Sequence, residues 1–72
     1  MERRATESQL VSLAAELSAV TESVRRSRDR IGGMLEPFLG TDREDIVAAL
    51  YESERMLRSA ERALDRASRS AG

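Results

Sequence analysis

The chain has 72 residues, of which 35% are charged, and its net charge at pH 7 is −1. This length excludes more than one domain, and the absence of Cys and His excludes disulfides, thiolate metal sites and the usual general base near neutral pH. The near-zero net charge argues against a dedicated DNA- or RNA-binding protein, which normally carries a clear basic excess. Chains this short rarely bury enough apolar surface alone, so we expect oligomerisation to complete the fold.

The first predicted helix covers residues 6–34. Thr6 and Gln9 have the spacing of a capping box, in which each side chain bonds the other residue's backbone amide. Large apolar residues then follow at alternating steps of three and four, with Ser27 as one polar interruption. This seam consists of Leu10, Leu13, Leu17, Val20, Val24, Ile31 and Met34. Such a heptad pattern, held for more than three heptads, predicts an amphipathic helix that pairs with another helix.

The predicted turn covers residues 35–41 and is unusually apolar. Gly32, Gly33 and Pro37 favour the end of the first helix here. The apolar tip consists of Met34, Leu35, Phe38, Leu39 and Tyr51. Two interpretations stay open: the tip docks into a partner, or it folds over the open end of the hairpin and closes its core. We favour the second, because a bundle end must be closed.

The second predicted helix covers residues 42–69. Thr41 and Glu44 again have capping-box spacing, and Asp42, Glu44 and Asp45 suit the positive end of the helix dipole. The seam of this helix consists of Ile46, Leu50, Ser53, Leu57, Ala60, Leu64, Ala67 and Ala71. Its period is again three and four.

The short turn forces the two helices to lie antiparallel. Charge agrees, because residues 6–20 and 42–56 are net negative whereas residues 21–35 and 57–69 are net positive. Antiparallel packing places each negative half beside a positive half. The predicted fold is therefore all-α: an antiparallel, coiled-coil-like two-helix hairpin that forms a single domain over residues 1–72.

The apolar face of the second helix is wider than one neighbour requires. Ala49, Met56 and Ala63 flank its seam, and most residues of this face are small. A wide stripe is typical of a helix that packs against two neighbours in a bundle. We therefore expect a homodimer that forms a four-helix bundle. The alternative is that the alanines are good helix formers at half-exposed positions.

Polar residues at two places permit further interpretations. Ser27 and Ser53 interrupt the seams, either as a polar layer that fixes register or as serines bonded to their own helix backbone. The arginines of residues 25–30 could contact phosphates, although they spread around the helix and Asp29 interrupts them, which favours a solvated, salt-bridged face. All 12 basic residues are Arg, which favours a GC-rich bacterial genome as the source.

We find no catalytic residues, no cofactor-binding motif and no metal-ligand set in the sequence. Ser without His or Lys lacks an activating base, and the paired glycines alone indicate only a turn. No apolar run reaches the ~20 residues of a membrane span, and the start of the chain is polar, so we expect a cytoplasmic protein without a membrane partner.

The predicted hairpin resembles, in architecture only, the Trp-x-Gly family of type VII secretion substrates, which form helical-hairpin dimers. The chain has no Trp, and Arg55 stands four residues after Tyr51, where that family's export signal has an acid. The resemblance implies an exported hairpin.

Three functions follow from the sequence. The leading hypothesis is a non-enzymatic interaction, adaptor or regulatory protein that acts as a homodimer and presents a surface to a larger protein partner. The second is a small regulator that binds nucleic acid or a nucleotide through Arg-rich helix surfaces. The third and weakest is the exported hairpin.

Overall fold

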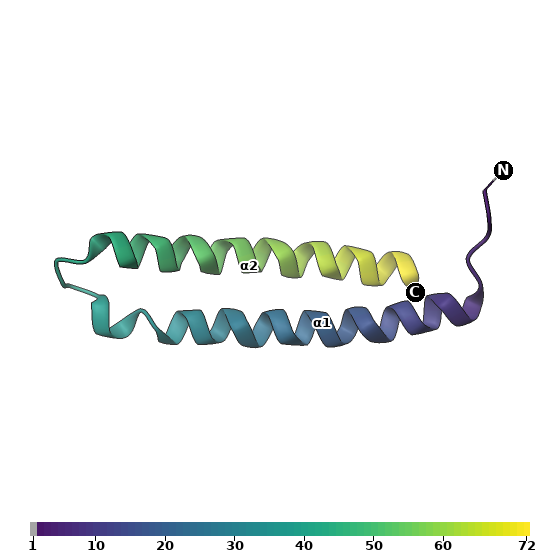
Figure 1. The fold of residues 1–72 in the computed structure, drawn as a ribbon, viewed down its shortest axis with the longest axis horizontal. Coiled ribbons are helices and arrows are strands. Elements are labelled where there is room, and N and C mark those ends of the chain that lie inside the picture. Colours follow the sequence, from purple (N-terminus) through teal and green to yellow (C-terminus); the bar gives the residue numbers. More distant parts are fainter. Residues whose placement is uncertain (1) are drawn as a thin grey trace.

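A computed structural model describes residues 2–72 of the chain and shows two long helices folded back on each other (Figure 1). Helix α1 covers Glu7–Gly33, a single 3-10 turn η1 covers Glu36–Phe38, and helix α2 covers Glu44–Ala71. The two helices run antiparallel and lie side by side along most of their length. The prediction of an all-α helical hairpin is confirmed, and no strand occurs among the described residues.

The start of α1 is fixed by the predicted capping box, which is confirmed. The amide of Gln9 donates to Thr6 Oγ1 over 3.1 Å, and the amide of Thr6 donates to Gln9 Oε1 over 2.9 Å. The two bonds satisfy backbone donors that the first helical turn leaves free, which defines where the helix begins.

The connection between the helices is a compact loop with η1 at its centre. Pro37 lies in the first turn of η1, where its missing N–H costs nothing, and Gly40 adopts a φ of 75° that side chains rarely allow. The hydroxyl of Thr41 donates to the Phe38 carbonyl over 2.7 Å and accepts from the Arg43 amide over 3.2 Å. Thr41 therefore stabilises the loop.

The predicted capping box at the start of α2 is wrong. Because the Thr41 hydroxyl bonds within the loop, α2 begins two residues later than it would with Thr41 as its N-cap. Arg43 is the N-cap residue, and no side chain caps the helix. Arg43 instead forms an ion pair with Asp45 over 2.9 Å.

The hairpin is only one helix layer thick. Its principal extents are 58 × 22 × 13 Å, and the shortest is close to the ~10–12 Å diameter of a single helix. The radius of gyration is 17.2 Å, against about 11 Å for a compact domain of this length. No side chain among the described residues is fully buried.

Candidate helix-pairing surface

The contact between the helices is centred on every seventh residue of the predicted seams. In α1 these are Leu17, Val24 and Ile31, and all three are half-buried. In α2 they are Leu50, Leu57 and Leu64, which are half-buried as well. These six residues form the apolar centre of the hairpin.

The helices are rotated away from the other half of the predicted seams. Of the residues three positions after the central ones, Ala60 and Ala67 in α2 are half-buried and the others are exposed, with Val20 at 48%. The residues four positions after the central ones lie in the contact instead: Thr21 and Glu61 are buried, and Arg28 is half-buried. The structure thus places a polar side of each helix in the contact and leaves an apolar side outside it.

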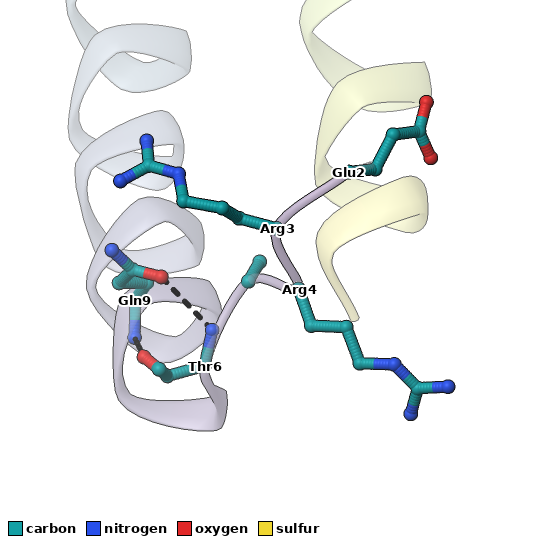
Figure 2. A pocket seen from close by; sticks show the side chains of 6 residues that line it. Glu2, Arg3, Arg4, Thr6 and Gln9 are labelled. Atoms are coloured by element: carbon teal, nitrogen blue, oxygen red, sulfur yellow. Dashed lines mark hydrogen bonds between the residues drawn. The ribbon is translucent and has the colours of Figure 1, made fainter.

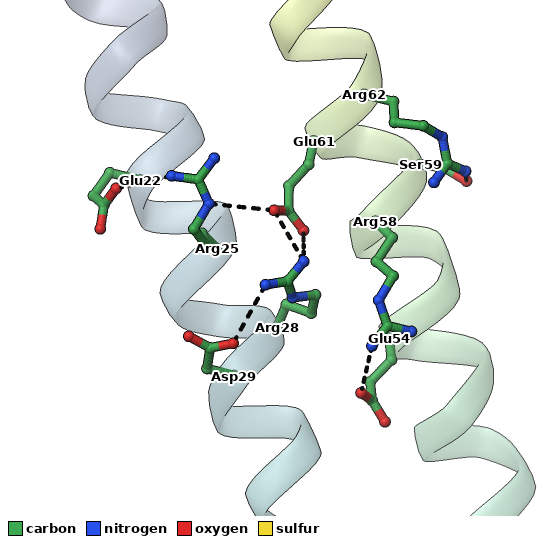
Figure 3. A network of polar contacts seen from close by, with 9 residues as sticks. All are labelled: Glu22, Arg25, Arg28, Asp29, Glu54, Arg58, Ser59, Glu61 and Arg62. Atoms are coloured by element: carbon green, nitrogen blue, oxygen red, sulfur yellow. Dashed lines mark hydrogen bonds and ion pairs between the residues drawn. The ribbon is translucent and has the colours of Figure 1, made fainter.

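Charged residues from both helices meet along one edge of the contact, shown in Figure 3. Arg28 Nη1 donates to both carboxylate oxygens of Glu61, over 2.9 and 3.1 Å, and Arg25 Nε lies 3.5 Å from Glu61 Oε1. Nearer the turn, and within α2, Glu54 pairs with Arg58 over 3.4 Å. We call this row, which also contains Thr21, the polar edge.

The burial of these polar groups is possible because each one has a partner. Thr21 donates its hydroxyl to the Leu17 carbonyl over 2.7 Å, and the Glu61 carboxylate lies between two guanidinium groups. Among residues 2–72, no buried side-chain nitrogen or oxygen lacks a hydrogen-bond partner. A buried charge that is paired in this way avoids most of the cost of leaving water.

The opposite edge of the hairpin is apolar and exposed. Each residue of a helix is rotated by about 100° from the one before, so residues three and four positions after a central one lie on opposite sides of it. Arg28 and Glu61 are both four positions after a central residue and they contact each other. The sets three positions after must therefore share the other side of the hairpin.

We call this second row the apolar edge and define it by its residues. They are Leu13, Val20 and Met34 on or next to α1, and Ile46, Ala49, Met56, Ala60, Ala63 and Ala67 on α2, of which Ile46, Ala60 and Ala67 are half-buried. Leu13 is 44% exposed, Met34 43% and Met56 55%. A shallow groove opens along the same side and is lined by Ser27, Arg30, Ile31, Met34 and Leu57.

The tip residues are divided by the structure. Leu35 is buried and Phe38 is half-buried at the closed end of the hairpin. Met34, Leu39 and Tyr51 are exposed. Leu35 and Phe38 thus lie where a plug of the core would lie, whereas Met34 extends the apolar edge.

The serines of the seams do not meet in the hairpin. Ser27 and Ser53 are both exposed, and Ser53 donates its hydroxyl to the Ala49 carbonyl over 2.9 Å. This bond to the preceding helical turn is the local alternative to a polar layer between the helices.

Three of the four arginines in residues 25–30 lie beside carboxylates, and Arg30 forms no ion pair within residues 2–72. Arg25 pairs with Glu22 and Glu61, and Arg28 pairs with Glu61 and Asp29. Guanidinium groups held this way are poorly placed to contact phosphates, since each would first have to leave a carboxylate.

No metal site is visible in the described part of the chain. No group of three acidic residues lies close enough to hold a metal ion within residues 2–72. One hollow lies at the free end and is lined by residues 2–6 and Gln9 (Figure 2). The side chains of Arg3 and Arg4 extend away from each other there, and the polar groups that meet are those of the Thr6–Gln9 capping box.

Sequence reasoning missed the polar edge, although a signal for it exists. Glu54 and Glu61 are seven residues apart, and each directly follows a seam position of the second helix. Thr21 and Arg28 are also seven residues apart, and each directly follows a seam position of the first helix. Acids and a base at heptad spacing beside two antiparallel seams could have indicated a charged row between the helices.

Comparisons with protein-family models, with curated proteins and with solved structures found no match to the chain. Neither α1 nor α2 contains, within residues 2–72, a stretch long and apolar enough to span a membrane.

Proposed function

We propose that the chain is a non-enzymatic interaction protein that pairs with other helices through its apolar edge, and that a homodimer is its working form. The observation that carries the proposal is the exposure of Leu13, Val20 and Met34 beside Met56 on one side of the hairpin. Apolar side chains gathered on one face of a small protein are typical of an interaction surface.

The amount of exposed surface supports this proposal. The hairpin exposes 5771 Å², whereas a compact monomer of 8.0 kDa would expose only roughly 4,500 Å². A stable interface of standard size removes about 800 Å² from each partner. The excess surface of the hairpin is therefore large enough to supply such an interface.

The layer structure of the molecule supports it as well. Domains are built from at least two packed layers of secondary structure, because one layer cannot cover its own apolar face. This hairpin has one layer. A second hairpin on the apolar edge would provide the second layer and would complete a four-helix bundle.

The test compares two substitutions of the same kind at different places. Val20→Glu puts a charge on the apolar edge, whereas Val11→Glu puts one at a 65% exposed position outside that edge. Both replace Val with Glu within α1, so their effects on helix propensity match. Sedimentation velocity at rising chain concentration then reports self-association.

We expect the unmodified chain and Val11→Glu to associate and Val20→Glu to remain a single chain, because a buried unpaired charge is costly. Equal association of both variants would remove the apolar edge from the proposal. Circular dichroism checks that both variants remain helical.

A further inference from the structure

We infer that the apolar edge binds a second copy of this chain in one orientation: the two hairpins pack face to face, with their turns at opposite ends and α1 antiparallel to α1 of the other copy. This inference rests on the proposed function and names its partner, orientation and register. The charges that lie along the edge favour this orientation.

Two opposite charges stand on the α1 side of the apolar edge. Glu16 and Arg30 are three residues after Leu13 and Ser27 respectively, so both project from the same side of α1. Both are exposed, and neither forms an ion pair within residues 2–72. They remain free to pair with another molecule, unlike Arg25 and Arg28 on the polar edge.

The spacing of these charges is self-complementary. Ser23 lies midway between Glu16 and Arg30. If the two-fold axis passes near Ser23, Glu16 of each copy lies opposite Arg30 of the other, and the symmetry creates this pair twice. The same register brings Leu13 near Met34 outside the charged pairs and Val20 near Ser27 between them, so apolar residues flank each pair.

On the α2 side, the same axis pairs the part of the edge from Met56 onward and leaves Ile46 and Ala49 beyond the end of the other copy's α2. The ion pairs of Arg25 and Arg28 with Glu61 together place Ser23 at a level between Ala63 and Arg66 of α2. The residues of α2 on either side of this level are Ala60 and Ala67. Small side chains from two copies would meet there and allow the α2 helices to approach closely.

The other face-to-face arrangement lacks this complementarity. With both turns at the same end, α1 would lie against α2 of the second copy at the level that it has within the hairpin. Arg30 would then lie beside Met56, and Glu16 beside Ser70. Neither charge would then face an opposite charge at its own level, which favours the orientation with opposite turns.

Charge reversal tests the orientation. Glu16→Arg and Arg30→Glu each place like charges opposite each other at two symmetric positions. We expect each single variant to raise the dissociation constant of the dimer by about tenfold or more, since each of the two pairs changes from attraction to repulsion. The double variant Glu16→Arg/Arg30→Glu restores opposite charges and should return the constant to within about threefold of the unmodified value.

The matched control is Arg62→Glu, which makes the same charge change on an exposed part of α2 away from the apolar edge. It should leave the dissociation constant unchanged. Because the double variant keeps Glu at position 30, its recovery cannot come from the effect of that residue on the end of α1.

Sedimentation equilibrium separates the failures. A dimer that is lost in Val20→Glu but unaffected by either charge reversal overturns the orientation and leaves the proposed function standing. A double variant that dimerises as weakly as the single variants overturns the proposed register as well. An unmodified chain that stays a single hairpin at every concentration overturns both proposals.

Discussion

Glu61 is 7% exposed, which makes it one of the most buried residues of the described chain even though it carries a charge. Its carboxylate accepts two hydrogen bonds from Arg28 and lies beside Arg25. Removal of a carboxylate from water is costly, and the hydrogen bonds from Arg28 Nη1 to both carboxylate oxygens offset that cost. At the residue scale, this contact explains why a polar side of each helix can face the other.

Truncation of Glu61 should therefore destabilise the hairpin. Glu61→Ala leaves two guanidinium groups without their shared carboxylate, and we expect a loss of about 1–2 kcal/mol in the free energy of unfolding. This is less than the roughly 3–5 kcal/mol for a fully buried pair, because solvent reaches Arg28. Urea unfolding measures the loss, and the exposed Glu22→Ala serves as the control with a change below about 0.5 kcal/mol.

The pair of Arg43 and Asp45 predicts a pH effect at the start of α2. The hydrogen bond from Arg43 lowers the pKa of Asp45 below its usual value, while the same bond raises the pKa of Arg43. Because the folded-state pKa of Asp45 is the lower one, its contribution to stability is present above the unfolded-state pKa and disappears as the pH falls through the folded-state value.

Arg43→Gln should raise the pKa of Asp45 toward that of an unpaired Asp. A titration of the Asp45 carboxyl carbon by NMR, with and without the substitution, measures the change. An identical titration curve in the two proteins would show that the ion pair does not form in solution.

The two long helices differ in how they begin. Thr6 and Gln9 cap α1 reciprocally, whereas α2 begins at Arg43 without a side-chain cap. Thr6→Ala should cost about 1 kcal/mol, and Arg43→Ser should gain about 0.5–1 kcal/mol by supplying the missing acceptor. Urea unfolding of both variants is compared at one fixed chain concentration, since self-association would shift the midpoint. No gain from Arg43→Ser would mean that its ion pair with Asp45 offsets the absent cap.

The two helices also show which parts of the fold the sequence predicts. The heptad period predicts two helices and the short connection predicts their antiparallel packing, because both depend on local geometry. The period does not predict the rotation of each helix about its axis. Val20 and Thr21 are adjacent candidates for the same contact, and the choice of Thr21 depends on the match of Arg28 with Glu61 across the two helices. A single amphipathic pattern contains no such pairwise information.

The loop shows a second reason for a missed detail. Thr41 has the spacing of a cap, but its hydroxyl has a competing acceptor in the Phe38 carbonyl. The competition depends on how η1 folds, which the residues around Thr41 alone do not determine. The rotated helices and the shifted start of α2 both arise from contacts outside the local pattern.

At the scale of the whole molecule, the hairpin is a single layer with a charged edge and an apolar edge. The charged edge is satisfied within the chain, and the apolar edge is exposed. This asymmetry separates the two tasks of the surface: one edge holds the two helices together, and the other is available for a partner. A charged side chain placed on the apolar edge should therefore weaken association more than it lowers helix content.

The central claim is that the apolar edge is covered by a second copy of the chain. The most direct test is sedimentation equilibrium of the unmodified protein across the micromolar range. The account predicts a mass approaching twice the 8.0 kDa of one chain, together with an unfolding temperature that rises with concentration. A mass of one chain at every concentration, with an unfolding temperature independent of concentration, would contradict it.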